Sequence, residues 1–490
     1  MPTPNPTPSS SAIPPGWDVI IGLEVHAQIA SNSKLFSRAA TTPYAEANTQ
    51  VSFIDAALPG VLPRPNQACI NQAIITALGL NGNIQLYSRF DRKHYFYPDL
   101  PQGYQISQYH HPISLGGFVA IQDENGNDKN VRVTRLHMEQ DAGKSVHDLM
   151  PDATAIDLNR SGVALMEIVF EPDLTSSQQA VNLMRTLRNL LRYLGSCDGN
   201  MEAGNLRADV NVSVRRSGAP LGTRCELKNL NSMRFIQQAI DYEAQRQIDC
   251  IENGETIIQQ TRLFDTQQGR THAMRSKEEA HDYRYFPDPD LPPLVLEQTH
   301  IDALKEQMPE LPQQRYQRFI DSYKLKPADA ALLTSDKSTA DYFENALDNR
   351  DAPTVARWIL GALKGLLNKD NTDIDSSPIQ PSALGKLIDL VDNGTLSERI
   401  AKDVLNDMAE SGEDAPTIVQ RKNLAQISDS DTLGKIIDTI LAQHQDKVAA
   451  YHNGKEQLFG FFVGETMRAT QGKANPQTAN ALLKDKLKAQ

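Results

Sequence analysis

Glu24 and His26 stand two positions apart in the alternating segment Leu23–Ile29. In a β-strand, residues two positions apart project from the same face, so the carboxylate and the imidazole would point together. These two groups can supply part of a divalent-metal site. The alternative, which this pair taken alone favours, is a solvated Glu–His pair on the protein surface.

A second alternating segment, Arg135–Lys144, would place Arg135, His137 and Glu139 on one face of a strand. Gly143 lies in the Gly-Lys turn that follows, where it would let the backbone approach a ligand closely. The pattern is typical of a catalytic strand and, equally, of an exposed and charged edge strand.

Glu167 is the acidic residue whose position is most unusual, because it stands inside the apolar run Ala164–Phe170. Removing a carboxylate from water costs free energy unless the group is paired or bound to metal. Metal ligation by Glu167 would meet this requirement, and so would a buried ion pair with Arg160.

Polar and apolar residues alternate again in the segment 206–213, which precedes the polar segment 225–231. One strand face would carry four different hydrogen-bonding side chains, namely Arg207, Asp209, Asn211 and Ser213. Such a face suits a ligand-binding sheet, although a solvated face has the same pattern.

Aromatic and basic residues gather in two further segments, Arg89–Pro98 and His281–Pro287. Arg and Lys bind phosphates, and aromatic rings stack on bases or on the adenosine of a nucleotide. Each segment taken singly is explained as well by a structural aromatic cluster.

The common nucleotide-binding and hydrolase motifs do not occur in the chain. There is no Gly-x4-Gly-Lys-Ser/Thr loop, no Gly-x-Gly-x-x-Gly after a strand and no Gly-x-Ser-x-Gly. The residues by themselves favour an enzyme that places carboxylates on sheet faces, binds Mg²⁺ and an anionic substrate, and transfers phosphoryl groups. A metal-dependent nuclease would use a similar carboxylate cluster.

The elements that must position these residues form an α+β pattern. Strands are expected over 18–22, 131–138, 164–170 and 210–214, and helices over 176–194 and 232–251. Residues 17–295 are therefore expected to form one large domain with a mainly antiparallel sheet. A Pro-rich segment at 288–293 marks its end. The chain beyond has a helical pattern, with domains expected at 296–375 and 376–490.

Length and composition limit the class of protein. A chain of 490 residues suggests two to four domains, and no apolar run reaches the ~18 residues of a membrane span. Residues 1–16 are expected to be a disordered leader. The four widely spaced cysteines indicate reduced thiols in the cytoplasm. A net charge of −12 argues against a nucleic-acid-binding surface over the whole protein but permits local basic patches.

Taken in order, these segments resemble the B subunits of aspartyl/glutamyl-tRNA amidotransferases. The similarity runs from residue 17 nearly to the end of the chain. The matching strings include IGLEVHAQI (21–29), FDRKHYFYPDLPQGYQISQY (90–109), TRLHMEQDAGKS (134–145), DLNRSGVALMEIVFEPD (157–173), LRADVNVSVR (206–215), CELKNLNSMRFI (225–236) and GFFVGETMRATQGKANP (460–476).

The resemblance implies a glutamine-synthetase-like catalytic cradle domain, an all-α domain and a small all-α tail. It implies a carbon–nitrogen ligase that uses ATP and Mg²⁺ to phosphorylate Glu or Asp mischarged on tRNA(Gln) or tRNA(Asn), after which ammonia displaces the phosphate. An amidase A subunit would make the ammonia from glutamine, and a small C subunit would brace the pair. The alternative is a tRNA-binding scaffold whose catalytic site has decayed, and this alternative predicts gaps among the acidic positions.

The matching strings also imply roles for individual residues. The family's metal ligands correspond to positions that are all present in this chain, namely Glu24, His26, Glu139, Glu167 and Asp209. Contacts to phosphate or substrate are expected from Lys93, Arg207, Lys228 and Asn229. Contacts to the tRNA backbone are expected from the basic tail, in particular from Lys455, Arg468 and Lys473. Ala203 and Gln140 depart from the family, which often has Glu at both positions, and Glu202 is expected to replace the carboxylate missing at 203.

Overall fold

The computed structural model describes residues 13–276, 283–370, 372–425, 430–470 and 472–489. The chain divides into two compact units, Met1–Pro312 and Gln313–Gln490. Most of the expected leader lies outside the described residues, as do His281 and Asp282 of the second aromatic segment. All four cysteines are free thiols. Among the helices of the described residues, none is long and apolar enough to cross a membrane.

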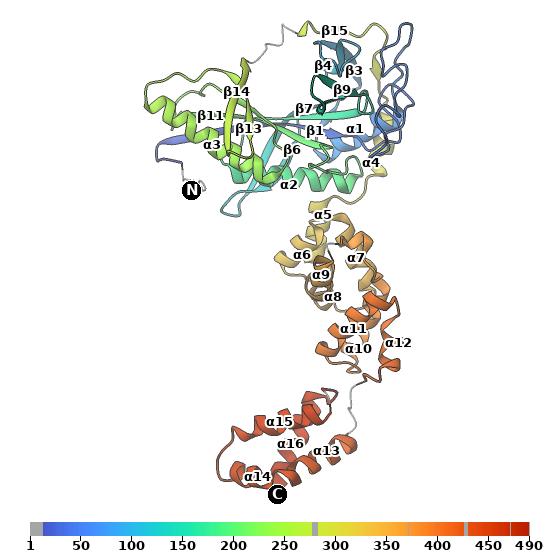
Figure 1. Ribbon diagram of the computed structural model, residues 1–490, viewed down its shortest axis with the longest axis vertical. Coiled ribbons are helices and arrows are strands. Elements are labelled where there is room, and N and C mark those ends of the chain that lie inside the picture. Colours follow the sequence, from blue (N-terminus) through green and yellow to red (C-terminus); the bar gives the residue numbers. More distant parts are fainter. Residues whose placement is uncertain (1–12, 277–282, 371, 426–429, 471, 490) are drawn as a thin grey trace. The chain divides into compact units, whose positions relative to one another are not determined.

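A ten-stranded sheet forms the centre of the first unit (Figure 1). Its long central strands are, in order, β11 (Leu206–Arg216), β1 (Trp17–Gln28), β10 (Ala164–Phe170) and β7 (Asp128–Gln140). Beyond β11 lie β12 (Cys225–Lys228), β13 (Gln260–Asp265) and β14 (Arg270–Ser276). Beyond β7 lie β5 (Ser114–Leu115) and β2 (Asn83–Ile84), and β6 (Phe118–Gln122) also pairs with β7.

The four strands expected from the sequence are the four central strands of this sheet. The expected helices are also present, as α2 (Ser177–Leu194) and α3 (Met233–Glu252). These elements confirm the α+β class. The pair β12 and β13 is parallel whereas the central strands pair antiparallel, so the sheet is mixed.

One face of the central sheet is apolar and supports the helices. On β1, Leu23, Val25 and Ala27 have no exposed surface, and they share one hydrophobic core with side chains of α1 (Gln67–Gly79), α2 and α3. Helix α2 begins where the Ser176 hydroxyl accepts a hydrogen bond from the backbone N–H of Gln179. The core fixes the strand register, because a slip of one residue would turn every polar side chain into it.

A smaller sheet lies against the polar face of β7. It contains β3 (Tyr87–His94), β4 (Tyr104–His111), β15 (Phe286–Pro287) and β16 (Leu294–Val295). The hairpin of β8 (Lys144–Met150) and β9 (Ala153–Asp157) forms a separate two-stranded sheet. The Gln108 side-chain oxygen accepts from the backbone N–H of Met138 at 3.0 Å, and the Gln105 amide donates to the Gln140 carbonyl at 2.7 Å. These bonds hold the aromatic residues of β3 and β4 over the polar face.

The first unit extends past residue 295, because Ile301 and Leu304 of α4 (Gln298–Glu306) pack into its core.

The second unit is helical, as the sequence predicts, and has two main hydrophobic cores. The first core contains residues from Phe319 to Val419, on both sides of residue 375. It is built by α5 (Pro312–Asp321), α6 (Pro327–Thr334), α7 (Lys337–Leu347), α8 (Ala352–Trp358), α9 (Lys364–Lys369), α10 (Pro381–Asp392), α11 (Glu398–Ser411) and α12 (Ala415–Arg421). The second is built by α13 (Ser430–Gln443), α14 (Gln445–His452), α15 (Leu458–Ala469) and α16 (Pro476–Ala489).

The loop after β1 is anchored by a buried ion pair. Lys34 has no exposed surface, and its ammonium donates to the Asp55 carboxylate at 3.1 Å and to the Leu158 carbonyl at 3.3 Å. Burial lowers the pKa of Lys34, and the charge of Asp55 opposes this effect. Removing one partner of such a pair leaves the other charge buried and uncompensated.

We expect Asp55→Ala to lower the free energy of unfolding of the first unit by about 3–5 kcal/mol. The chain has two tryptophans, Trp17 in the first unit and Trp358 in the second. Urea unfolding followed by fluorescence in a Trp358→Phe background therefore reports on the first unit alone. The control is Arg132→Ala, which removes an exposed partner of Asp173 and should cost less than about 1 kcal/mol. Equal losses in the two variants would contradict the anchoring role.

Candidate active site

The strand register brings the candidate site residues together. His26 on β1 lies opposite Glu167 on β10 and opposite Arg207 on β11. Glu167 in turn lies opposite His137 on β7. Because side chains alternate between faces along each strand, these residues share the polar face of the central sheet.

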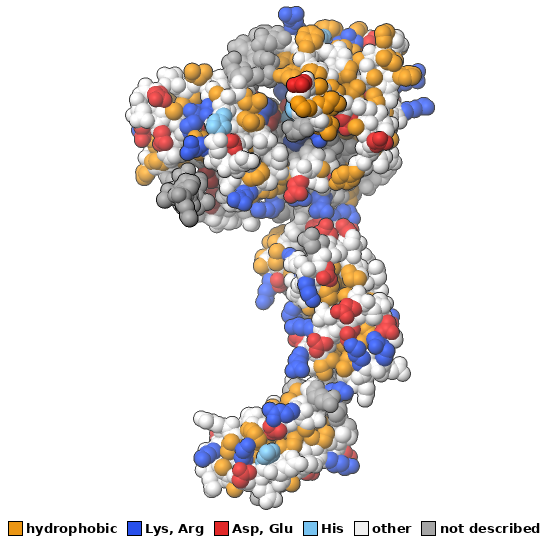
Figure 2. Space-filling model, viewed as in Figure 1, with side chains coloured by type: hydrophobic (Ala, Val, Ile, Leu, Met, Phe, Trp, Pro, Cys, Tyr) orange, Lys and Arg blue, Asp and Glu red, His pale blue; other side chains and the backbone are white. Residues whose placement is uncertain are grey.

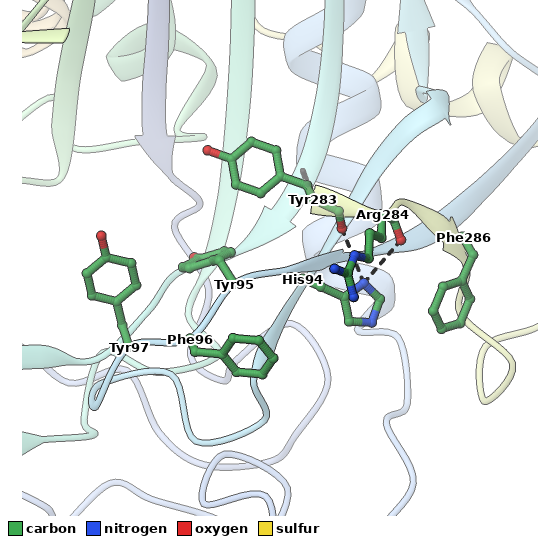
Figure 3. Close-up of a pocket in the computed structure, with 7 residues that line it drawn as sticks. All are labelled: His94, Tyr95, Phe96, Tyr97, Tyr283, Arg284 and Phe286. Atoms are coloured by element: carbon green, nitrogen blue, oxygen red, sulfur yellow. Dashed lines mark hydrogen bonds between the residues drawn. The ribbon is translucent and has the colours of Figure 1, made fainter. Parts of the chain in front are cut away.

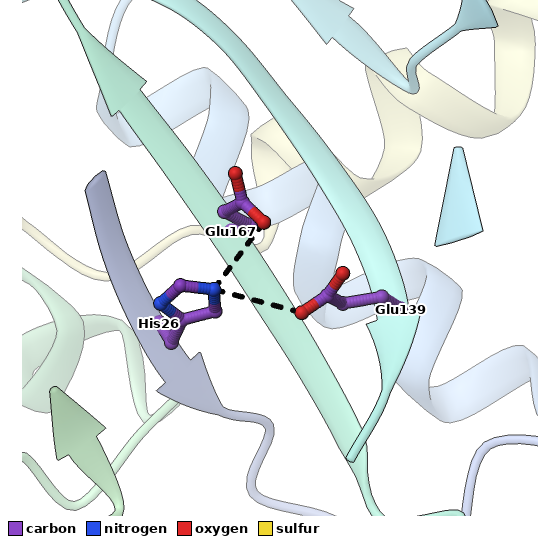
Figure 4. A group of neighbouring side chains, drawn as sticks. All are labelled: His26, Glu139 and Glu167. Carbon is purple, nitrogen blue, oxygen red and sulfur yellow. Dashed lines mark ion pairs between the residues drawn. The ribbon is translucent and has the colours of Figure 1, made fainter. Parts of the chain in front are cut away.

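Three of the expected metal ligands converge on one point (Figure 4). The Nε2 atom of His26 lies 3.3 Å from Oε2 of Glu167 and 3.6 Å from Oε1 of Glu139. One ligand atom from each of these three residues lies within 4.8 Å of the others. His137 closes the group, with its Nε2 3.4 Å from Glu167. Ser107 on β4 donates to Glu139 at 3.4 Å.

The charges in this cluster depend on one another. Burial alone would lower the pKa of His26, but the hydrogen bond to Glu167 and the charges of Glu167, Glu139 and Asp209 raise it to about 9. Burial would raise the pKa of Glu167, but His137 and His26 hold it well below its usual range. Without a metal ion, a proton on His26 therefore supplies the positive charge that the two carboxylates require.

The two structural alternatives considered for this region are wrong. Arg160 does not pair with Glu167; its guanidinium lies 3.5 Å from Asp141 and donates to the carbonyls of Ala142 and Gly143. Glu139 is buried and does not lie on an exposed edge strand. The close approach expected at Gly143 is to protein backbone, since an added Cβ would lie 2.9 Å from the carbonyl oxygens of residues 99 and 157.

The other two expected ligands belong to a neighbouring group. Asp209 forms an ion pair with Lys228, which also lies 3.3 Å from Glu226. Glu24 accepts a hydrogen bond from the Asn211 amide at 3.0 Å. Burial lowers the pKa of Lys228, but Asp209 and Glu226 outweigh it and raise the pKa above its ordinary value. Lys228 is thus a half-buried cation held between two carboxylates.

Both groups open into one cavity of about 620 Å³. Its acidic lining is Glu24, Glu139, Glu167, Asp209 and Glu226, and its basic lining is Lys93, Arg135, Arg224 and Lys228. Tyrosines complete the wall, and Tyr109 stacks on Tyr285 with ring centroids 4.2 Å apart. Sequence reasoning missed Ser107, Tyr109 and Glu226. The alternation of Glu226 with Lys228 could have indicated Glu226, whereas no periodic signal marked β4.

Some of the residues expected to contact phosphate line the cavity, whereas others bind protein groups outside it. Lys93 lines the cavity, with its ammonium 4.9 Å from the centre of the Tyr283 ring. Arg207 donates to both carboxylate oxygens of Asp141 at 3.2 Å and is not among the lining residues. Asn229 donates to the Phe264 carbonyl at 3.1 Å, which supports β13 rather than the cavity wall.

Neither position that departs from the family supplies a carboxylate to the cavity. Ala203 and Glu202 are exposed in a turn, and Glu202 is not among the cavity-lining residues. Gln140 is buried, and its amide donates to the Gln102 side chain at 2.6 Å. The replacement of Glu by Gln at 140 therefore exchanges an anion for a neutral hydrogen-bonding group in a buried position.

The expected tRNA contacts lie in the second unit, around α15. Lys455 precedes α15, Arg468 is in its last turn and Lys473 follows it. Arg468 is highly exposed and forms a surface ion pair with Glu465 at 2.7 Å. On the face of the second unit seen in Figure 2, basic and acidic side chains are interspersed.

In the metal-free protein, the pKa of His26 should depend on the charge of Glu167. Glu167→Gln should lower the pKa of His26 from about 9 toward its ordinary 6.5, because the variant removes the largest favourable contribution to the imidazolium. Glu226 lines the same cavity, so Glu226→Gln is the matched control, and it should leave the pKa of His26 near 9. An NMR titration of the imidazole, assigned with His26→Gln, measures both.

The raised pKa of His26 also makes the stability of the metal-free fold depend on pH. Since the folded-state pKa of His26 lies above 6.5, the protonated imidazole stabilises the metal-free fold fully below pH 6.5. This contribution is lost as the pH rises through about 9. An unchanged pKa in Glu167→Gln would show that Glu167 is not the group that charges His26.

The sequence profile described as the GatB/GatE catalytic domain matches residues 19–302, and the profile described as the GatB domain matches residues 341–487.

The chain is 52% identical over 471 residues to the aspartyl/glutamyl-tRNA(Asn/Gln) amidotransferase B subunit of Rickettsia bellii (strain RML369-C), covering 96% of this chain and 98% of the relative. It is 53% identical to the protein of that name from Acidiphilium cryptum (strain JF-5), covering 96% of this chain and 97% of the relative. It is 54% identical over 482 residues to that of Bartonella quintana (strain Toulouse), covering 97% of this chain and 96% of the relative. The chain therefore belongs to the family of aspartyl/glutamyl-tRNA(Asn/Gln) amidotransferase B subunits.

Proposed function

We propose that the chain uses ATP to phosphorylate the side-chain carboxylate of Glu or Asp mischarged on tRNA(Gln) or tRNA(Asn), and that ammonia then converts the acyl phosphate to the amide. The observation that carries this proposal is the convergence of His26, Glu139 and Glu167 in a cavity that also presents the ammonium groups of Lys93 and Lys228. Phosphoryl transfer depends mainly on positioning and on neutralising charge, and this cavity offers both.

The residues fit a divalent metal ion. Two carboxylates and an imidazole offer ligand atoms within 4.8 Å of one another, and the pKa of His26, raised to about 9, reflects the unbalanced negative charge there. Mg²⁺ characteristically uses one or two carboxylates together with waters and substrate phosphates. When bound, such an ion would neutralise charge on the transferred phosphoryl group. Glu24 and Asp209 are the next carboxylates available in the cavity.

Lys93 and Lys228 are suited to hold the phosphates. Burial lowers the pKa of Lys93, but the charges of Glu139 and Glu167 outweigh burial and raise it. Both lysines therefore stay charged at neutral pH. A half-buried ammonium interacts with phosphate more strongly than a fully exposed one because screening is weaker.

The reaction needs no nucleophilic side chain from this protein. The substrate carboxylate oxygen attacks the γ-phosphorus, the bond to the β,γ-bridging oxygen breaks, and ADP leaves. Ammonia then attacks the acyl carbon, the bond to the phosphate oxygen breaks, and inorganic phosphate leaves as the amide forms. An acyl phosphate hydrolyses readily, so prompt delivery of ammonia to the cavity would limit its loss to water.

The central sheet and the small sheet over it form the glutamine-synthetase-like cradle. The relatives' name, which marks them as B subunits, supports an assembly with an amidase A subunit that supplies ammonia and with a small C subunit. The presence of all five expected ligands disfavours the alternative of a scaffold with a decayed site. We place the assembly in the cytoplasm, where charged tRNAs are found.

Glu167→Ala should reduce tRNA-dependent ATP consumption by at least about 1000-fold, because it removes a carboxylate that a catalytic metal ion requires. The assay uses the complex with its amidase partner, Mg²⁺, and Glu-tRNA(Gln), Asp-tRNA(Asn) or correctly charged tRNAs. The matched control is Glu202→Ala, an exposed glutamate in the same unit, which should retain normal turnover.

Affinity for tRNA should change less than twofold in Glu167→Ala, since the residue lies in the cavity and not in the basic tail. Normal ATP turnover by this variant would remove Glu167 from the site. If the unaltered complex bound tRNA tightly but consumed no ATP with either mischarged tRNA, the result would favour the scaffold alternative.

Replacing Lys455, Arg468 and Lys473 together by Gln should weaken tRNA binding without changing the amidase reaction of the partner. If each residue neutralises one phosphate, the slope of log affinity against log salt should fall by about 2–3. Substitution is preferable to deletion of 451–490, since α15 and α16 supply Phe462, Leu483 and Leu487 to a hydrophobic core. Replacing Lys386, an exposed lysine on α10 of the same unit, by Gln is the control. An unchanged salt slope would reassign the tail to assembly.

A further inference from the structure

A second cavity of about 590 Å³ adjoins the catalytic one (Figure 3). It is lined by His94, Tyr95, Phe96, Tyr97, Tyr283, Arg284 and Phe286. Tyr95, Tyr97 and Tyr283 also line the catalytic cavity, so the two spaces share one wall of tyrosines. The two cavities are therefore adjacent along this row of tyrosines.

The second cavity has the chemistry of a site for a base and a phosphate. Five of the seven lining side chains described in the structure are Phe or Tyr, and none is acidic. Aromatic rings stack on nucleobases, and a guanidinium such as that of Arg284 binds phosphate. The absence of carboxylates from this lining distinguishes it from the catalytic cavity, where carboxylates face a proposed metal ion.

The backbone that carries Arg284 is fixed in an unusual conformation. Arg284 has a φ of 47°, a left-handed conformation that side-chain-bearing residues rarely adopt. The Nδ1 atom of His94 lies 3.3 Å and 3.2 Å from the carbonyl oxygens of Tyr283 and Arg284, so it donates to this turn. The His94 ring also stacks on Phe286, with ring centroids 4.9 Å apart. His94 thus connects β3 to the turn and holds both sides of the cavity together.

We propose that this aromatic cavity binds the 3′-terminal nucleotides of the charged tRNA, with a base stacked on Phe96. The proposal rests on the proposed function, because the amino acid to be phosphorylated is esterified to the terminal adenosine. An adenosine held here would lie next to the tyrosine wall, and its aminoacyl group would project into the catalytic cavity. The arrangement would position the acyl carboxylate without any contact to the amino-acid side chain.

Exposure favours a nucleic-acid strand over the adenine of ATP. Phe96 is 85% exposed, Tyr97 51% and Phe286 43%. Small-molecule sites usually bury about 70–90% of their ligand, which rings this open would not achieve. Open aromatic platforms beside a basic group are typical of proteins that bind single-stranded nucleic acid, and the 3′ end of a tRNA is single-stranded.

The test compares two forms of tRNA(Gln), one complete and one lacking the terminal adenosine. The full-length chain in complex with its partner subunits should bind the complete form more tightly, and Phe96→Ala should reduce this preference by at least about fivefold, the lower limit for loss of one stacked base. Phe53→Ala is the matched control, since Phe53 is a 71% exposed phenylalanine of the same unit that lines neither cavity. In turnover assays, Phe96→Ala should raise the KM for charged tRNA and leave the KM for ATP unchanged.

Two outcomes would overturn the proposal. A preference for the terminal adenosine that is equal in Phe96→Ala and Phe53→Ala would exclude the aromatic cavity as its binding site. A higher KM for ATP with unchanged tRNA binding would assign the cavity to the adenine of ATP. The binding comparison requires neither ATP nor turnover. A complex that shows the Phe96-dependent preference but forms no amide would therefore support the cavity's role while contradicting the proposed reaction.

Discussion

The meeting of two carboxylates, one buried and one largely buried, at one imidazole is the interaction on which the site depends. Glu139 and Glu167 approach His26 from different strands, and their mutual repulsion must be balanced by a positive charge. In the protein alone, a proton on His26 provides that charge. The same negative field keeps Lys93 protonated in spite of its burial. The carboxylates therefore determine the protonation state of the groups around them.

Such an arrangement persists only because the opposite face of the sheet is strongly apolar. Leu23, Val25 and Ala27 on β1 are fully buried against the helices, and residues of β7, β10 and β11 enter the same core. Slipping any one strand by a single position would place carboxylates in that core and apolar side chains in the cavity. The free energy of burying the apolar face thus fixes the position of Glu167 opposite His26, although neither residue contributes to the core.

Much of this fold and part of the site follow from local sequence periodicity. The alternation around Glu24, Glu139, Glu167 and Asp209 identified the four central strands and the face that each polar residue occupies. Periodicity does not reveal which strands are neighbours in the sheet. His26, Glu139 and Glu167 form one group and Asp209 belongs to another because of the strand order and because Lys228 pairs with Asp209. Ser107 and Tyr109 were missed because β4 has no clean alternation; four consecutive residues of this strand are buried. Asn229 and Arg207 have suitable side chains, but each is engaged by another part of the protein.

The charge of the whole chain gives little information about the charge that a substrate meets. The protein carries a net charge of −12, yet the cavity proposed as the active site presents five carboxylates against four Lys and Arg side chains, with two histidines between them. Under the proposed function, a triphosphate entering this cavity alone would face all five carboxylates, with only the four Lys and Arg side chains to offset its charge. A divalent ion alone would have to displace the proton of His26, whose pKa of about 9 opposes this at neutral pH. Under the proposed function, each ligand would supply charge that the other lacks, so we expect the metal ion and ATP to bind together more tightly than either alone.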